Sequence, residues 1–150
     1  AEGLPKFKTA VYAEKGRRRL LTMLAVGYAT TAVHQALWGG AHLFYSNLKL
    51  AGALRCFIVA ACAHVCQTAA VAGPKRLSSE TYRTLNLALA VEAALSFVSV
   101  AHLVHAVAKA QAAQGLTQPF YFPLLSCALP SIKLLSAVGG LTVGKLYREE

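Results

Sequence analysis

Long apolar stretches separated by short polar ones dominate the sequence. Residues 84–108 contain no glycine or proline and a single charged residue, Glu92. A helix rises about 1.5 Å per residue, so about 20 apolar residues cross the hydrocarbon core of a bilayer. This stretch is therefore long enough to span a membrane. With the other apolar stretches it leads us to expect four spans, at residues 20–45, 50–73, 84–108 and 120–144.

The connections between these stretches favour a simple topology. The connector 46–49 is so short that the first two helices should be antiparallel neighbours. Ser78 or Ser79 is placed to cap the third helix, with Glu80 in its first turn. Pro130 falls inside the fourth span, where we expect it to kink the helix. The prediction is an all-α membrane protein with one domain, an antiparallel bundle of four transmembrane helices whose N- and C-termini lie on the same side.

The composition agrees with this class. Hydrophobic residues make up 56% of the 150 residues and charged residues 14%, whereas a soluble domain has about 25% charged residues. The net charge is +9, but the basic residues flank apolar stretches and are not interleaved with aromatic residues. We therefore expect lipid headgroups, and not nucleic acid, to be the partners of these charges.

Lysine and arginine gather on one predicted side of the membrane. Residues 1–19 hold six of them, the 74–83 loop three and the C-terminal end two, against Lys49 and Lys109 on the other side. The positive-inside rule then places both termini in the cytoplasm, or in the matrix or stroma of an organelle. Segment 1–19 is expected to be a short surface helix or a solvated tail. The residues expected to lie at lipid headgroups and fix the topology are Arg17, Arg18, Arg19, Lys75 and Arg76.

The chain starts at Ala1 and not at Met, as a chain does after a targeting peptide has been removed. Together with the basic terminal side, this favours an organelle membrane. We expect the mitochondrial inner membrane, with both termini in the matrix. A plastid membrane and a plasma membrane are the alternatives.

Three charged side chains fall inside predicted spans. Arg55 is close enough to the membrane boundary for its side chain to snorkel to the interface. Glu92 lies about 12 Å and Lys133 about 16 Å from the terminal side, on consecutive helices. Since a lone charge is costly in lipid, we expect an intramembrane Glu92–Lys133 ion pair that sets the register of the last two helices. The alternative is a proton or ion pathway through Glu92.

All five histidines also fall in predicted spans. Imidazole at membrane depth can ligate haem iron, and helical bundles hold cofactors between facing helices. His34 and His102 are the first candidate pair for haem b, and His42 and His105 the second. The alternative is a neutral histidine hydrogen-bonded to a neighbouring helix.

Conventional catalytic sites are missing from the sequence. There is no aspartate, so a Ser-His-Asp triad is excluded, and Glu92 is the only acid in a span, which excludes a carboxylate-bridged metal pair. The four cysteines fall in apolar stretches, where a thiol behaves as a small hydrophobe, and we expect no metal site.

These observations predict a non-catalytic accessory subunit of a larger membrane complex, either a respiratory complex or an ATP synthase. Other membrane subunits and lipids would be its partners. No cofactor is required, although a bound phospholipid is expected to suit such a bundle. A haem b- or quinone-associated membrane anchor is the first alternative, and a small proton or ion carrier that uses Glu92 is the second.

Overall fold

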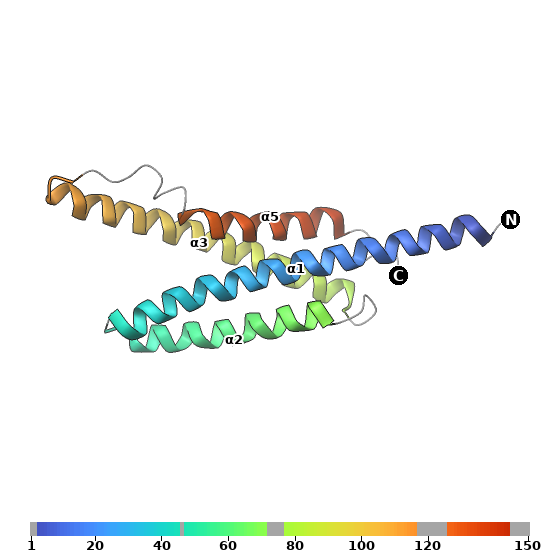
Figure 1. Cartoon of the computed structure of the whole chain (residues 1–150), viewed down its shortest axis with the longest axis horizontal. Helices are drawn as coiled ribbons and strands as arrows, with labels where there is room; N and C mark the ends of the chain where they lie inside the picture. The colour runs from blue at the N-terminus through green and yellow to red at the C-terminus, as the bar shows by residue number, and fades with distance from the viewer. Residues whose placement is uncertain (1–2, 46, 72–76, 117–125, 145–150) are drawn as a thin grey trace.

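The computed structural model describes residues 3–45, 47–71, 77–116 and 126–144, and the side chains of all of these except 3–10 and 45. Over these residues the chain is all-helical (Figure 1). Its helices are α1 (Gly3–Tyr45), α2 (Lys49–Val71), α3 (Ser79–Ala113) and α5 (Ala128–Val143).

Three of these helices are long and apolar enough to cross a membrane: α1 over Val11–Phe44, α2 over Lys49–Val71 and α3 over Ser79–Ala113. They indicate an integral membrane protein. Helix α5 is also apolar but has 16 residues, or about 24 Å. The first residues of the predicted fourth span, 120–125, lie outside the described residues, as do Lys75 and Arg76.

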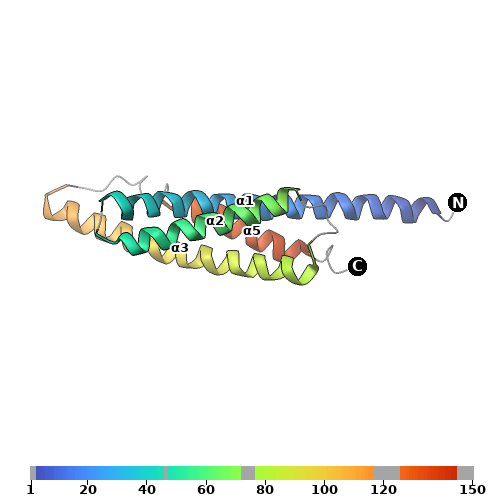
Figure 2. The ribbon, with the colours of Figure 1, turned by 90° about the horizontal axis from the view of Figure 1, so that it is seen from below.

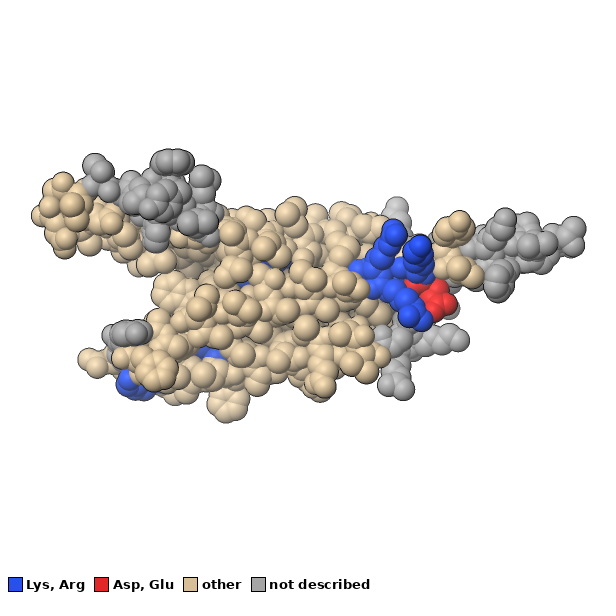
Figure 3. Space-filling view, viewed as in Figure 1, with Lys and Arg blue, Asp and Glu red and all other residues tan. Residues whose placement is uncertain are grey.

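Helix α1 joins the basic N-terminal segment to the first apolar stretch without a break. Its 43 residues extend over about 64 Å, so the basic segment is part of the spanning helix and not a separate tail or surface helix. Arg17, Arg18 and Arg19 belong to this extension, and Arg18 pairs with Glu14 at 2.9 Å. Figure 3 shows the largest group of blue side chains at this end of the visible face and a smaller one at the opposite end, with a mostly uncharged surface between them.

Local hydrogen bonds cap both ends of α3. At the start, the Ser78 side chain accepts a hydrogen bond from the Thr81 amide at 3.2 Å, as predicted for a serine cap, and Glu80 lies in the first turn. At the end, Gly115 adopts a φ of 70°, and the Leu116 amide donates to the Gln111 carbonyl at 2.9 Å. A glycine in this left-handed conformation closes many helices. The span predicted at 84–108 therefore lies inside a longer, capped helix.

Helix α1 packs against both α2 and α5, and α5 also packs along α3 (Figures 1 and 2). Helix α2 lies along α1 with little other support. Glycines permit the close approaches. A Cβ atom on Gly52 of α2 would meet Cγ of Leu43 at 2.7 Å, and one on Gly140 of α5 would meet the Tyr82 hydroxyl at 2.9 Å. Small residues at helix crossings are how membrane helices pack closely, because lipid supplies little hydrophobic drive between them.

The core lies where α1, α3 and α5 meet. Leu24, Leu89 and Ala137 are at most 1% exposed, and the Tyr28 hydroxyl of α1 donates to the Leu85 carbonyl of α3 at 2.8 Å. By contrast, many large apolar side chains elsewhere are exposed, such as Phe57 of α2 and Leu95 of α3. An exposed apolar surface of this kind suits contact with lipid.

The kink predicted at Pro130 stays a prediction, because residues 117–125 on the N-terminal side of this proline lie outside the described residues. Helix α5 begins at Ala128, so Pro130 falls in its first turn. The first amides of a helix have no partner inside the helix, and a proline there removes no hydrogen bond. Pro130 is buried at the start of α5 and does not bend its middle.

Candidate functional site

A polar cluster lies inside the bundle, centred on the amino group of Lys133. The Lys133 side chain is fully buried. Its Nζ atom lies 2.9 Å from Oε2 and 3.0 Å from Oε1 of Glu92, and 2.9 Å from Oγ of Ser96. It also lies 2.7 Å from Nδ1 of His34. The single amine of α5 thus contacts polar groups of both α3 and α1.

Glu92 receives further hydrogen bonds from α1 and from its own helix. Oε1 accepts from Nε2 of Gln35 at 3.2 Å and from Oγ of Ser96 at 2.9 Å. Thr31 lies at the edge of hydrogen-bonding distance, 3.5 Å from Oε2. The carboxylate is therefore surrounded by donors, which is how a charge is tolerated away from water.

Arg55 is the residue of α2 that contacts the cluster. Its Nη1 atom donates to Oε1 of Gln35 at 2.7 Å, and its guanidinium lies 5.8 Å from the ring centre of Trp38. Trp38 in turn donates from Nε1 to Nε2 of His34 at 3.0 Å. The expectation that Arg55 snorkels to the interface misses these partners, because the side chain turns inward to α1.

Helical periodicity explains why α1 supplies four of these groups. Thr31, His34, Gln35 and Trp38 follow the three- and four-residue spacing that keeps side chains on one face of a helix. Glu92 and Ser96 have the same relation on α3. The cluster is therefore built from one face each of α1 and α3, closed by Lys133 and Arg55.

The ion pair between Glu92 and Lys133 joins α3 to α5. A buried ion pair contributes little net stability relative to apolar packing, but loss of one partner leaves the other charge unpaired and costs about 3–5 kcal/mol. The pair therefore penalises other alignments of these two helices more than it stabilises this one.

The four histidines considered as haem ligands have different surroundings. Nε2 of His34 accepts a hydrogen bond from Trp38, and Nδ1 lies 2.7 Å from Nζ of Lys133. His102 and His105 of α3 are exposed, and His42 is half-buried with its ring centre 6.0 Å from that of Trp38. His34 would have to give up one of its contacts before it could bind iron.

Metal ligands and disulfides are also absent from the residues that the structure describes. These residues hold no group of three or more histidine, cysteine or acidic side chains able to hold a metal ion. Cys56, Cys62, Cys66 and Cys127 are free thiols.

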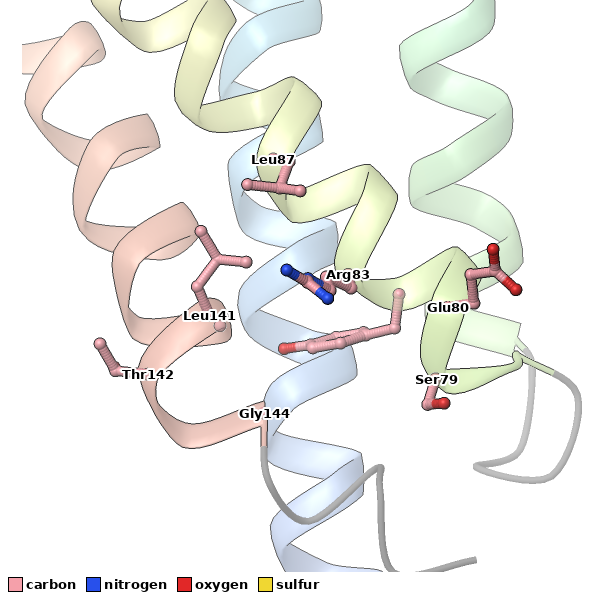
Figure 4. A pocket seen from close by; sticks show the side chains of 9 residues that line it. Ser79, Glu80, Arg83, Leu87, Leu141, Thr142 and Gly144 are labelled. Carbon is pink, nitrogen blue, oxygen red and sulfur yellow. The ribbon is translucent and has the colours of Figure 1, made fainter.

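Among the cavities that adjoin the described helices, two are lined by both polar and apolar side chains. One of about 690 Å³ lies between the start of α3 and the end of α5; Figure 4 shows Arg83 and Leu87 of α3 facing it together with Leu141 and Thr142 of α5. The other, of about 430 Å³, lies beside the polar cluster and is lined by α1, α2 and α3. It brings Gln35, Arg55 and Glu92 to one accessible space. This second cavity is the candidate binding site.

Sequence reasoning missed part of the cluster. Thr31 and Gln35 carry no charge, and nothing in their spacing separates them from other polar residues of the first span. Asn86 was missed for the same reason, although it is fully buried and packs against Gly140. The sequence feature that could have identified Gln35 is its position: it follows His34 and lies three residues before Trp38, which places it on the same side of the helix as Trp38.

Comparison with known proteins identifies no relative of the chain. No protein-family model, curated protein or solved structure matches the chain.

Proposed function

We propose that this chain is a non-catalytic subunit of a larger membrane assembly, which it joins as a four-span antiparallel bundle with both termini on the same side. One observation carries the proposal: α1 and α3 extend beyond the helices that pack against them (Figure 1). At about 64 and 52 Å, both are much longer than a hydrocarbon core of about 30 Å.

Within the described part of the chain, the two extensions have little to pack on. In α1, Val11 is 48% exposed and Tyr12 is 73% exposed. In α3, none of the residues after Val100 is buried. A helix without tertiary packing is only marginally stable in water, so most helices in proteins depend on a packed face. Other subunits would supply that packing at the ends of the bundle.

The proposed location is the mitochondrial inner membrane, in a respiratory complex or an ATP synthase. The basic residues on the terminal side support the orientation in which that side faces the matrix. Fractionation of mitochondria and protease protection of tagged termini test this placement. Termini that are digested in intact inner-membrane vesicles of matrix-in orientation would contradict it.

Co-migration tests the subunit role. A tagged chain is extracted in mild detergent and run on a native gel, and the band is cross-linked through its lysines. We expect migration with a larger assembly and cross-links from Lys15 or Lys109 to other proteins. A chain that migrates alone and cross-links only to itself would refute the proposal.

A matched pair of variants sharpens the test. Tyr12 and Phe57 have nearly equal exposed fractions, 73% and 75%, but Tyr12 lies on the extension of α1 and Phe57 on the apolar face of α2. Tyr12→Ala should weaken co-migration, whereas Phe57→Ala should leave it unchanged. The opposite ranking would place the contact on α2 instead.

A second candidate function is proton or ion transfer through Glu92. The observation that favours it is that the Glu92 side chain keeps 24% of its surface exposed and borders the smaller cavity. Liposomes containing the purified chain should then conduct protons, and Glu92→Gln should abolish the conductance. Equal conductance in both would remove this candidate. The haem anchor is tested by the absorption spectrum of the purified protein, in which a Soret band would support it.

A further inference from the structure

The cavity beside the polar cluster has a wall from each of the three longest helices. His34, Gln35 and Trp38 line it from α1, with Arg55 on α2 and Glu92 and Ser99 on α3 among the other lining residues. Helices α2 and α3 make little contact with each other, so the space between them is not closed by packing. Its volume of about 430 Å³ is within the range of about 300–1,000 Å³ usual for small-molecule sites.

The charge along this cavity is not balanced. Glu92 is neutralised by Lys133, and Glu14 by Arg18. Among the described residues no carboxylate forms an ion pair with Arg55, which contacts the Gln35 oxygen and the face of Trp38. A guanidinium has five N–H donors, and one of them serves Gln35. The site therefore presents a cation with unused donors, which calls for an anion.

The rim of the cavity is apolar. Leu54 and Ile58 of α2 and Leu95 of α3 line it and are 56%, 42% and 62% exposed. These side chains lie on helices long and apolar enough to span a bilayer, so their exposed surfaces suit contact with acyl chains. An occupant that reaches Arg55 past this rim comes from the lipid and carries apolar chains of its own.

The depth of Arg55 agrees with a lipid headgroup. It lies six residues after Lys49, the first residue of α2, which places it about 9 Å along the helix. Helix α2 is about 35 Å long and the hydrocarbon core about 30 Å thick, so Arg55 lies just inside the boundary. A phosphate at headgroup level needs only a small inward displacement to meet it.

We propose that this cavity binds an anionic phospholipid, with its phosphate on Arg55 and an acyl chain between α2 and α3. Arginine recognises phosphate through two parallel N–H donors, and Gln35 and Trp38 hold the guanidinium in place for this. The single unbalanced positive charge matches the single negative charge of a lipid such as phosphatidylglycerol. The inference goes beyond the subunit role, because lipid binding requires no other protein.

Trp38 provides a direct readout, since it is the only tryptophan of the chain and lines the cavity. The full-length protein is prepared in a neutral detergent, and phosphatidylglycerol or phosphatidylcholine is added while the tryptophan emission is recorded. We expect saturable binding of phosphatidylglycerol, at least tenfold tighter than that of phosphatidylcholine. Equal affinity for the two lipids would overturn the proposal.

Variants assign the site. Arg55→Gln should weaken phosphatidylglycerol binding about tenfold or more, and Arg55→Lys should weaken it less, because lysine keeps the charge but not the fork of donors. Lys49→Gln is the control, since Lys49 is an exposed cation at the same end of α2 and does not line the cavity. Circular dichroism and gel filtration check the fold of each variant. If Arg55→Gln fails to fold, the Arg55→Lys affinity decides. Unchanged affinity in the folded Arg55 variants refutes the site.

Inorganic phosphate and a neutral quinone test whether a ligand other than a phospholipid occupies the cavity. Inorganic phosphate alone should leave the emission unchanged, because it has no chains for the apolar rim. A neutral quinone should not displace the lipid. Saturable binding of free phosphate would identify phosphate, and not a lipid, as the ligand of the cavity. Displacement of the lipid by the quinone, if it persists in Arg55→Gln, would identify the quinone as the ligand.

Discussion

Nζ of Lys133 lies 2.9 Å from Oε2 of Glu92, yet the two side chains are buried to different extents: the lysine has no exposed surface and the glutamate keeps 24%. The lysine depends on the pair more than the glutamate does. If Glu92 is lost, the ammonium keeps only the neutral groups of Ser96 and His34 around it. If Lys133 is lost, the carboxylate keeps donors from Gln35 and Ser96 and access to the cavity.

This asymmetry predicts the ranking of three variants. Glu92→Leu should destabilise the bundle by about 3–5 kcal/mol, and Lys133→Met by less, because only the first leaves a charge wholly buried. The double variant should recover much of the loss. Free energies of unfolding in mixed micelles measure all three. Strictly additive losses would show that the two residues do not interact.

The Gly140 crossing predicts an effect of a single methyl group. A Cβ atom at Gly140 would meet Cγ of Asn86 at 2.7 Å as well as the Tyr82 hydroxyl. Gly140→Ala should therefore separate α3 from α5 and cost about 1–3 kcal/mol, as overpacking usually does.

Gly40→Ala is the control for that experiment. An added Cβ at Gly40 meets nothing within 4 Å, and alanine favours a helix over glycine by up to about 1 kcal/mol. This variant should be as stable as the parent or more so in the same unfolding assay. Equal losses at both glycines would mean that the α3–α5 contact is not tight.

Two serines on α3 offer a test of the hydrogen bonds to Lys133. Ser96 accepts from Lys133 at 2.9 Å, whereas the Ser99 hydroxyl donates to Leu95 of its own helix at 3.1 Å. Ser96→Ala should cost about 1–3 kcal/mol, because it removes one acceptor from a buried charged group. Ser99→Ala should change the free energy of unfolding by much less. A larger loss at Ser99 would contradict the assigned cluster.

One hydroxyl joins α1 to α3 outside the polar cluster. Tyr28 donates to the Leu85 carbonyl across the two helices at 2.8 Å, so Tyr28→Phe should cost about 0.5–1.5 kcal/mol. Tyr12→Phe removes a hydroxyl from a ring that is 73% exposed, and its unfolding midpoint should match that of the parent. If Tyr28→Phe has the same unfolding midpoint as Tyr12→Phe, the Tyr28 hydroxyl does not stabilise the contact between α1 and α3.

Sequence reasoning reached the helices because hydropathy over some twenty residues is a sum, which tolerates errors at single positions. It also named Glu92 and Lys133 as partners, since depth along two neighbouring helices follows from counting residues. The partners of Arg55 depend on how α2 is rotated about its axis, and many weak apolar contacts decide that rotation. For the same reason, the sequence did not identify Gln35 as the residue that connects the arginine to Glu92.

Helix α1 runs without a break from the basic N-terminal segment to the polar cluster. The same rigid helix carries the exposed basic turns at one end and His34, Gln35 and Trp38 further along, and α2 rests on it. A partner that binds the projecting end therefore contacts the same helix that packs on both α2 and α5. One continuous helix therefore joins the basic end to the buried charges, through the contacts from His34 to Lys133 and from Gln35 to Glu92.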